Sequence, residues 1–470
     1  MTSQSRLSQI IENKREKLIE VSNQIWEYAE TGFEEFKSAK LLCQTLAEEG
    51  FEVEQGVANI ETAFIGSFGS GKPVIAFLGE FDALTGLSQN GGIAQPNPQQ
   101  IGGNGHGCGH NLLGTGSLAA AIALRDYMQE NNITGTVRYY GCPGEEIGGG
   151  KTFMAKEGIF NDVDIALSWH PGTTNNIMSV ATLACYEVYF KFKGKSAHAA
   201  ASPHLGRSAL DAVELMNIGV NYLREHIIPE ARVHYAITNT GGSSPNVVQA
   251  EAEVLYFVRA PRVSQTDDIY QRICDIARGA ALMTGTEVDI DLASALSNVI
   301  PNTTLEQVMY DNFVKLGTPS YTDAELHFAE AIRETLSEEE KKMDVQRNQK
   351  LAGKAIADVI DPFMSDAFMA GSTDVGDVSW IVPTAQCMTA CEPLGTPLHT
   401  WQIVATGTTS LAHKGMLHAG KILAATALDI LQQPELIEQA QAELVDRRAG
   451  EVYTSPLPSD VKQYKIRSKK

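Results

Sequence analysis

Few features of a secreted or membrane-spanning protein occur in this 470-residue sequence. The first twenty residues interleave Lys, Arg and Glu with apolar side chains, so they lack the apolar core of a signal peptide. No apolar run reaches the ~18–20 residues that a membrane span requires, since the most apolar stretch, residues 112–124, contains Gly, Thr and Ser. These absences predict a cytoplasmic protein that makes no membrane contact.

Cysteine and basic residues are also scarce. The 7 cysteines are odd in number and spread over a long chain, which excludes a disulfide framework and predicts reduced thiols. The 37 Lys and Arg are outnumbered by 57 Asp and Glu, which gives a net charge of −20. Because nucleic acids and anionic membranes bind to basic faces, neither is an expected partner. The hydrophobic fraction of 43% is typical of a globular protein.

What the sequence does contain is a regular alternation of helices and strands. Residues 1–50 carry apolar side chains at helical spacing, and residues 74–78 form an apolar run typical of a strand that is buried on both faces. The next predicted elements are a helix over 112–128, a strand over 136–140, a helix over 152–157 and a strand over 165–169. This alternation predicts a three-layer α/β domain with a mostly parallel sheet.

The pattern changes after residue 184. The following elements have the order β-α-β-β-α-β, which is typical of a ferredoxin-like α+β domain with its helices on one face. They are a strand over 186–192, a helix over 207–224, strands over 233–237 and 252–259, a helix over 267–282 and a strand over 287–292. We therefore expect one domain made of residues 1–184 and 298–470, interrupted by a second domain at residues 185–297.

Residues 323–350 are strongly charged and predict an exposed helical excursion from the first domain. Ser337 and Glu340 have the spacing of a capping box, which predicts the start of a second helix within it. A lid that controls specificity is the alternative interpretation of this segment.

Side chains capable of chemistry gather where the predicted strands end. Loops that follow neighbouring parallel strands meet at the carboxyl edge of the sheet, where α/β proteins form their binding sites. Four segments there carry carboxylates, a thiol and imidazoles; they are residues 79–82, 103–111, 141–146 and 168–170. We expect these segments to lie close together in the folded chain.

Cys108 and His110 lie two positions apart in a loop where glycine flanks nearly every residue. Glycine allows a loop to wrap closely around a small ion, and thiolate with imidazole suits zinc and similar transition metals. Alone, the pattern also fits a tight turn with a buried thiol and a solvated imidazole. Together with the other strand-end loops, it favours a metal site.

Glu145 and Glu146 form a pair of adjacent carboxylates between Pro-Gly and a Gly-rich run. In a metal site, one carboxylate binds the metal and its neighbour takes the proton from a water whose pKa the metal lowers. The alternative is a pair of solvated surface acids. His399 lies later, in the Pro-containing loop 394–401, where a lone histidine is more often structural than a ligand.

The motifs Gly-His-Gly-Cys-Gly-His, Pro-Gly-Glu-Glu, Ser-Trp-His and Gly-Thr-Pro-Leu-His-Thr resemble those of a known hydrolase family. The family contains dinuclear metallo-hydrolases such as aminoacylase, glutamate carboxypeptidase and the amidohydrolases of hippurate and auxin conjugates. The thiol places the chain in the amidohydrolase branch, and the resemblance extends over nearly the whole length. It implies hydrolysis of the amide bond of an N-acyl amino acid, with p-aminobenzoyl-glutamate as the expected substrate. A β-alanyl or other N-acyl dipeptide remains an alternative.

The resemblance also implies the ligands of two divalent metal ions, either manganese or zinc. Cys108 would bridge the two ions. His110 and His170 would complete one site, and Glu146 and His399 would complete the other.

Further roles follow from the same resemblance. Glu145 would be the general base and later the proton donor to the leaving amine, and Asp82 would orient a metal ligand. The inserted domain would be a lid and dimerisation domain, in which His198 reaches the active site of the partner subunit. Asn246 and Arg259 would hold the substrate carboxylate. The implied assembly is a homodimer or a heterodimer with a paralogous subunit.

Two positions depart from the family pattern. The chain has Glu80-Phe81-Asp82 where the wider family has His-x-Asp, and Asn111 where many amidohydrolases have Asp. Neither change affects the five implied ligands. Two other hypotheses remain open: a thiol hydrolase in which Cys108 is the nucleophile and His110 its base, and a non-catalytic partner subunit.

Overall fold

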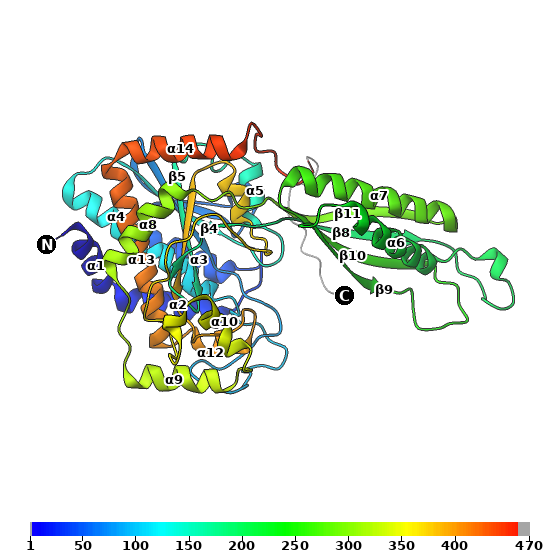
Figure 1. The fold of residues 1–470 in the computed structure, drawn as a ribbon, viewed down its shortest axis with the longest axis horizontal. Coiled ribbons are helices and arrows are strands. Elements are labelled where there is room, and N and C mark those ends of the chain that lie inside the picture. Colours follow the sequence, from blue (N-terminus) through cyan, green and yellow to red (C-terminus); the bar gives the residue numbers. More distant parts are fainter. Residues whose placement is uncertain (1, 459–470) are drawn as a thin grey trace.

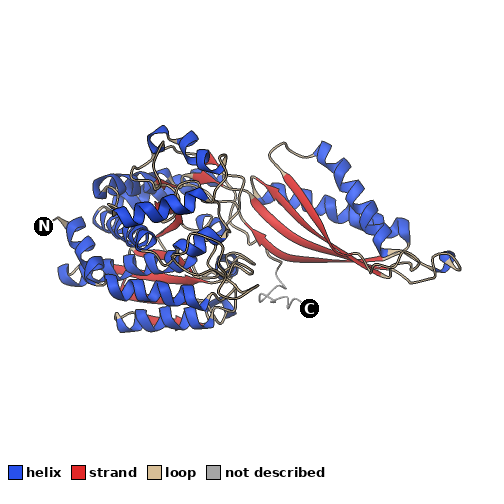
Figure 2. Ribbon diagram, turned by 90° about the horizontal axis from the view of Figure 1, so that it is seen from below, coloured by secondary structure: helices blue, strands red, loops and turns tan. Residues whose placement is uncertain are grey.

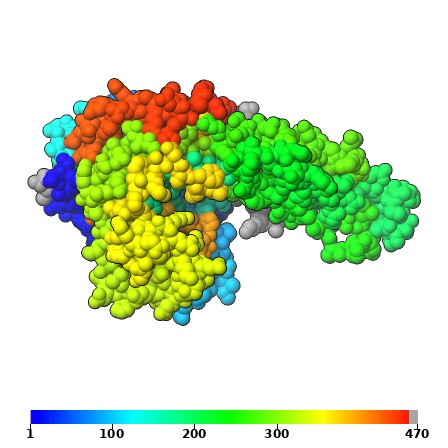
Figure 3. All heavy atoms as spheres, in the orientation of Figure 1, coloured from blue at the N-terminus to red at the C-terminus, as the bar shows by residue number. Residues whose placement is uncertain are grey.

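The computed structural model describes residues 2–458, which form two units joined side by side (Figure 1). The main unit holds the central sheet, and the inserted unit, residues 184–296, projects away from it. In the space-filling view the inserted unit stands out from the main unit as a separate arm (Figure 3). The chain leaves the main unit after Thr182 and returns at Val299, and a hydrogen bond from the Val299 amide to the Thr182 hydroxyl (2.9 Å) holds these two crossings together.

The main unit contains a seven-stranded sheet with the strand order β1-β2-β4-β3-β5-β13-β6. The neighbours β4-β3-β5-β13 are parallel to one another. At the two sides of this group, β2 pairs antiparallel with β4 and β6 with β13, and β1 pairs antiparallel with β2. Helices lie on both faces of this sheet (Figure 2), which confirms the predicted three-layer α/β fold. The strands are β1 Glu52–Gln55, β2 Phe64–Ser70, β3 Val74–Glu80, β4 Gly135–Cys142, β5 Ile165–Gly172, β6 Asn176–Ile177 and β13 Thr384–Ala390.

Alternate residues of the buried strands pack against different helix layers. In β3, Ile75 and Phe77 face the layer that contains α1, α2, α3, α4, α8 and α13, whereas Ala76 and Leu78 face α5 and α11. The helices are α1 Ser3–Asn13, α2 Arg15–Tyr28, α3 Phe36–Glu48, α4 His110–Asn131, α5 Gly150–Lys156, α8 Thr303–Leu316, α11 Val375–Ser379, α12 Trp401–Thr406, α13 Ser410–Gln432 and α14 Pro434–Arg448. This double burial explains the continuous apolar run of β3.

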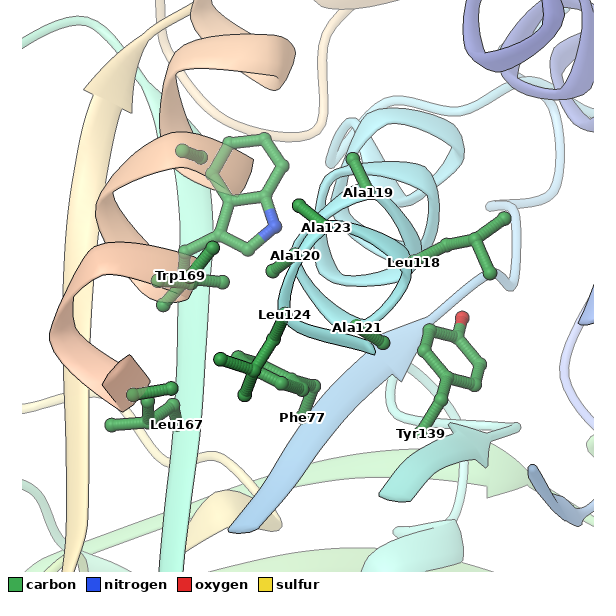
Figure 4. Packing of buried hydrophobic residues seen from close by; sticks show 14 of the residues in the cluster. Phe77, Leu118, Ala119, Ala120, Ala121, Ala123, Leu124, Tyr139, Leu167 and Trp169 are labelled. Carbon is green, nitrogen blue, oxygen red and sulfur yellow. The ribbon is translucent and has the colours of Figure 1, made fainter. Parts of the chain in front are cut away.

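The Ala-rich helix α4 occupies the centre of the first layer and begins at the Cys-x-His loop. Figure 4 shows it above the sheet, with Phe77 and Tyr139 directed toward it. Its small side chains let neighbours approach closely: a Cβ at Gly116 would lie 2.5 Å from the Trp169 ring. Close packing of this helix therefore fixes the loop at its start relative to the strand ends.

The inserted unit has four antiparallel strands in the order β11-β8-β10-β9, with two helices on one face. Its elements are β8 Ala184–Lys193, α6 Ala209–Leu223, β9 Arg232–Asn239, β10 Glu251–Ala260, α7 Val263–Thr284 and β11 Glu287–Leu296. The chain order and the strand order together are those of a ferredoxin-like domain, as predicted. Within residues 2–458, no helix covers the other face of this sheet (Figure 2).

A second excursion, residues 321–359, is called the α9–α10 segment below. It contains α9 Asp323–Glu334 and α10 Glu340–Arg347, and the predicted capping box of Ser337 and Glu340 is present, with the Glu340 carboxylate 2.7 Å from the Ser337 amide. The prediction of an exposed excursion is wrong for one face, because Ala329, Ile332 and Asp344 are buried. A small pair of parallel strands is formed by β7 Val180–Ala181, just before the chain enters the inserted unit, and β12 Ala367–Phe368.

All seven cysteines are buried free thiols, as predicted from their number and spacing. None of the helices described is both long enough and apolar enough to cross a lipid bilayer.

Candidate metal centre

The strand-end segments meet at the carboxyl edge of the central sheet. Glu80 ends β3, Glu145 and Glu146 follow β4, His170 lies near the end of β5, and Cys108 lies just before α4. In residues 2–458, His, Cys, Asp and Glu side chains form three groups in which every candidate ligand atom lies within 4.8 Å of the others. Two of these groups share Cys108.

The first group contains Cys108, His110 and His170, and the Cys108 Sγ lies 3.5 Å from the Nε2 of His170. Gly109 makes this approach possible, because its backbone has φ +76° and a Cβ there would lie 2.7 Å from the Pro171 side chain. The Gly-rich loop therefore passes directly over the end of β5 and brings the thiol to the imidazole.

Both histidines in this group are oriented through their Nδ1 atoms. The Nδ1 of His110 is 2.9 Å from an Asp82 carboxylate oxygen, and the Nδ1 of His170 is 2.7 Å from the Pro171 carbonyl oxygen. Each contact is a hydrogen bond that the ring N–H donates, so that the Nε2 atom faces the group as an acceptor. Such a carboxylate or carbonyl partner is the usual support of a metal-binding histidine. Asp82 thus lies where it would orient His110.

The second group contains Cys108, Glu146 and His399. The Nε2 of His399 lies 3.5 Å from a Glu146 carboxylate oxygen. Asp82 also accepts a hydrogen bond from the Glu146 amide (3.0 Å), so one carboxylate fixes a residue of each group. The structure therefore brings all five proposed ligands together around one shared thiol.

One carboxylate oxygen of Glu146 is buried without a hydrogen-bond partner, and the Nε2 of His110 has none either, although it lies 3.3 Å from a Glu80 carboxylate oxygen. Buried polar atoms are nearly always satisfied, so these two atoms are available to bind a metal ion. The donors are one thiol, three imidazoles and one carboxylate, which suit divalent transition metals. The residues present therefore fit a divalent metal site.

Electrostatics in the second group favour an ionised carboxylate. Although burial opposes it, the contact with His399 and the nearby His110 lower the pKa of Glu146 to about 2. Burial raises the pKa of the Cys108 thiol well above its ordinary value. A buried thiol of this kind becomes a thiolate when a metal ion displaces its proton, so loss of the proton is coupled to metal binding.

Glu145 belongs to the third group, with Glu80 and His110. Burial raises the pKa of its carboxyl well above the ordinary value, and the neighbouring carboxylates of Glu80 and Asp374 raise it further. A carboxylate of raised pKa is a stronger base, which suits a group that must take and return a proton near neutral pH. The two adjacent carboxylates therefore differ: the pKa of Glu145 is raised, which suits a base, and the pKa of Glu146 is lowered, which suits a ligand.

A buried lysine supports this third group. The Nζ of Lys151 lies 2.7 Å from a Glu80 carboxylate oxygen and 2.5 Å from an Asp374 oxygen, and all three side chains are almost fully buried. Burial lowers the pKa of Lys151, but Asp374 and Glu80 outweigh this effect and hold it well above the ordinary value. Lys151 therefore remains charged and compensates two carboxylates next to the candidate metal centre.

Replacing Lys151 with methionine should destabilise the protein by about 3–5 kcal/mol, because it leaves two buried carboxylates without their cation. The measurement is the free energy of unfolding in urea. The matched control is Lys354→Met, which removes a partly exposed i,i+4 ion pair with Asp358 and should cost less than about 0.5 kcal/mol. A Lys151→Met protein as stable as the control would contradict the role given to this triad.

Sequence reasoning did not identify Lys151, Asp374 or the supporting role of Glu35. Lys151 directly follows three glycines after the Glu-Glu pair, and this position was a usable signal. Glu35 accepts a hydrogen bond from the Gly144 amide (2.8 Å), and Gly144 precedes Glu145. No local pattern reveals this contact, because the two residues are 109 positions apart.

The residues of the inserted unit lie at its two ends. Arg259 pairs with Cys185 at the start of β8, near the main unit, and donates a hydrogen bond to Ser372 (3.3 Å). His198 follows the far end of β8, a ten-residue strand that spans roughly 33 Å. Asn246 lies beside it, since its carbonyl accepts a hydrogen bond from Ala199 (3.0 Å). Within one chain, Arg259 lies at the end near the main unit, whereas His198 and Asn246 lie at the outer end.

Comparisons with known proteins agree with this site. A model of peptidase family M20/M25/M40 matches residues 76–353. The chain is 50% identical over 464 residues to one of the subunits of p-aminobenzoyl-glutamate hydrolase from Escherichia coli K12, and the match covers 96% of each chain. It is 31% identical to the Xaa-Arg dipeptidase of Mus musculus, over 93% of this chain and 91% of the mouse protein.

Two further matches are more distant. Another subunit of the Escherichia coli p-aminobenzoyl-glutamate hydrolase is 26% identical, over 63% of this chain and 78% of that protein. A crystal structure from Bacillus subtilis, described as a dinuclear metal-binding peptidase, aligns with a TM-score of 0.58 and 18% identity. That alignment covers 90% of this chain and 99% of the Bacillus chain, and it shows a shared fold.

Proposed function

The chain belongs to peptidase family M20/M25/M40, and we propose that this metal-dependent amidohydrolase cleaves p-aminobenzoyl-glutamate to p-aminobenzoate and glutamate. Membership confirms the resemblance seen in the motifs and the expectation of a hydrolase. The observation that carries the proposed substrate is the 50% identity, over 96% of both chains, to one component of a hydrolase of that compound. The cellular location that we propose is the cytoplasm.

The proposal includes two divalent ions, manganese or zinc, with Cys108 between them. His110 and His170 would hold one ion, and Glu146 and His399 the other, as their grouping around the thiol supports. Bound divalent ions would supply a water of lowered pKa and polarise the substrate carbonyl. Thiolate ligation favours zinc, while the carboxylate and the imidazoles also accept manganese.

The side chains of the chain itself perform the proton transfers. Glu145, whose pKa burial raises, takes a proton from the attacking water as the carbon–oxygen bond forms. It then gives that proton to the amine nitrogen as the carbon–nitrogen bond breaks. Asp82 keeps His110 and Glu146 in place throughout, because it is hydrogen-bonded to both.

The substrate carboxylate would be held by the inserted unit. Arg259 offers a planar fork that suits a carboxylate, and one of its buried nitrogens, Nε, has no hydrogen-bond partner. His198 and Asn246 lie at the outer end of the same unit, so we propose that they act in the active site of a partner subunit. The partner is a second copy or a paralogous chain, and the similarity to two different subunits of the Escherichia coli enzyme supports a pair.

A second candidate function is that of a dipeptidase that removes a basic residue. The 31% identity to the mouse Xaa-Arg dipeptidase over most of both chains favours it. The two functions share the metal centre and differ in the charge of the amino acid released.

A panel of N-acyl amino acids separates these two functions. The metal-reconstituted chain should hydrolyse p-aminobenzoyl-glutamate with a kcat/KM at least about tenfold higher than that for an Ala-Arg dipeptide. The guanidinium of Arg259 attracts the second carboxylate of glutamate and repels the guanidinium of an arginine product, a difference of ~1.5 kcal/mol or more. The measurement is release of the free amino acid. A preference for the arginine dipeptide would replace the first function by the second. The Glu145→Gln protein is the control for contaminating activity.

A further inference from the structure

The proposed ligand His399 is held by few contacts of its own side chain. That side chain is 53% exposed, and its imidazole contacts the carboxylate of Glu146. Its backbone has φ +61°, a conformation that costs a non-glycine residue energy. The His399 amide donates a hydrogen bond to the Gly107 carbonyl (2.9 Å), next to Cys108. The position of the imidazole therefore depends on how firmly its loop is held.

The α9–α10 segment holds this loop on both sides of His399. On the N-terminal side, the Gly395 amide donates to the Asp344 carboxylate (2.8 Å), and the Arg333 guanidinium donates to the Leu394 carbonyl. On the C-terminal side, the Gln402 side chain donates to the Thr335 hydroxyl (3.2 Å). The Leu394 amide also donates to the Ala355 carbonyl (2.9 Å), so four hydrogen bonds connect the segment to a stretch of nine residues around the ligand.

The contact at Gly395 is a close approach of two backbones. Gly395 has φ +82°, and a Cβ there would lie 2.4 Å from the Glu340 carbonyl oxygen of α10. Glycine is therefore required here for both reasons, the positive φ and the lack of space. The loop cannot move toward α10, and its hydrogen bond to Asp344 keeps it from moving away.

Apolar packing adds to these hydrogen bonds. Leu394 and Leu411 belong to a small buried cluster that is separate from the main core and is formed largely by the α9–α10 segment. The buried members of the cluster are Ala329, Leu351, Ala355, Ile356, Ala357, Ala390, Leu394 and Leu411. The loop before His399 is therefore part of a core that exists only because this segment is present. In Figure 3, residues from about 330 to 360 cover the lower part of the main unit.

The start of the α9–α10 segment is fixed to helix α13. Glu325 in α9 accepts hydrogen bonds from Ser410 and from Lys414 (2.6 Å each), both in α13. The segment is therefore anchored at its start and makes contact with the loop through Arg333, Thr335 and Asp344. Asp344 is 5% exposed, and a buried carboxylate is stable only when it is hydrogen-bonded, so its contact with Gly395 is a strong constraint.

We propose that Asp344 and Arg333 of the α9–α10 segment are positioning residues for His399 and set the affinity of the ion held by Cys108, Glu146 and His399. This inference rests on the proposed function, since it assumes two ions. The ion held by Cys108, His110 and His170 has no ligand on the His399 loop. The hydrogen bonds from Asp344 and Arg333 to this loop, called the brace below, therefore affect the two ions unequally.

The test is metal binding to the metal-free protein, measured by equilibrium dialysis against zinc or manganese with elemental analysis. Asp344→Ala and Arg333→Met each remove one hydrogen bond to the loop. Each should weaken the binding of the ion held by Cys108, Glu146 and His399 about tenfold, the lower end of the effect typical of residues that support metal ligands. The affinity for the other ion should not change. Asp344→Asn keeps an oxygen that accepts from Gly395 and should bind both ions as the wild type does.

The matched control is Glu338→Ala, which removes an exposed i,i+3 ion pair with Lys341 in the same segment and should bind both ions normally. Circular dichroism verifies that each variant is folded, and Arg333→Met tests the brace even if Asp344→Ala does not fold. Unchanged affinity in Arg333→Met, or equal weakening in Asp344→Asn and Asp344→Ala, overturns the brace. A wild-type chain that binds fewer than two ions overturns the dinuclear site itself. The failure of the positioning role is seen in the variants and the failure of the dinuclear site in the wild type, so the two can be told apart.

Discussion

Replacing Glu145 with glutamine is expected to lower kcat by about 10²–10⁴-fold while the protein keeps its metal, because the amide cannot take and return a proton. Glu145 has the raised pKa of a base and is not one of the five residues grouped around Cys108. The measurements are the rate of p-aminobenzoate release and the metal content of the same sample.

The neighbouring carboxylate provides the comparison for this variant. Glu146→Gln removes a charged member of the second group, and it should therefore lose metal as well as activity. A Glu145→Gln protein with full activity would contradict the assignment of the base. A Glu145→Gln protein that loses metal to the same extent as Glu146→Gln would instead make Glu145 a ligand.

Replacing Cys108 with alanine is expected to have the largest effect on metal binding. Its Sγ belongs to both groups of candidate ligands, so one change removes a donor from each. The affinity for both ions should fall by more than about 100-fold, beyond the 10–100-fold typical of residues that only support ligands. Elemental analysis after dialysis measures this loss, and hydrolysis should fall with it.

Cys142→Ala is the matched control for this thiol. Cys142 is also buried and free, lies at the end of β4, and belongs to none of the groups of candidate ligands in residues 2–458. It should keep its metal. Two ions in the Cys108→Ala protein would exclude a bridging role. If the wild type contains no metal and the Cys108→Ala protein loses activity, the alternative in which Cys108 is a nucleophile is favoured.

The parts of the site that sequence reasoning could locate are those that lie next to predicted strand ends. Glu146 follows a strand, His170 lies near the end of one and Cys108 precedes a helix, and the apolar runs of these elements are clear. Parallel strands bring such positions to one edge. His399 is different, because without the family motif nothing in its own loop distinguishes a ligand from a structural histidine. In the structure, its grouping with Cys108 and with Glu146, 253 positions earlier in the chain, places it in the site.

The network around Lys151 could not be predicted for a related reason. Its partners Glu80 and Asp374 come from β3 and from the turn before α11, and neither position has a local pattern that distinguishes it from an ordinary strand-end or loop residue. The charged composition of residues 323–350 likewise predicts exposure, whereas Asp344 is buried by its contact with Gly395. Long-range pairing of charges is not visible in local composition.

In the inserted unit, the fold could be predicted from the sequence but the positions of the candidate residues could not. Its β-α-β-β-α-β order was clear because strand and helix periodicities alternate sharply. The positions of its candidate residues relative to the metal centre depend on strand length and direction, which put Arg259 at one end and His198 at the other. The sequence pattern alone does not place these two residues at opposite ends of the unit.

The number of metal ions per chain tests the central claim most directly. The purified wild-type protein, reconstituted and dialysed free of unbound metal, should contain two divalent ions per chain by elemental analysis and should release p-aminobenzoate from p-aminobenzoyl-glutamate. Removal of both ions by a chelator should abolish that activity, and their return should restore it. A chain that hydrolyses the substrate equally well without bound metal would contradict the account.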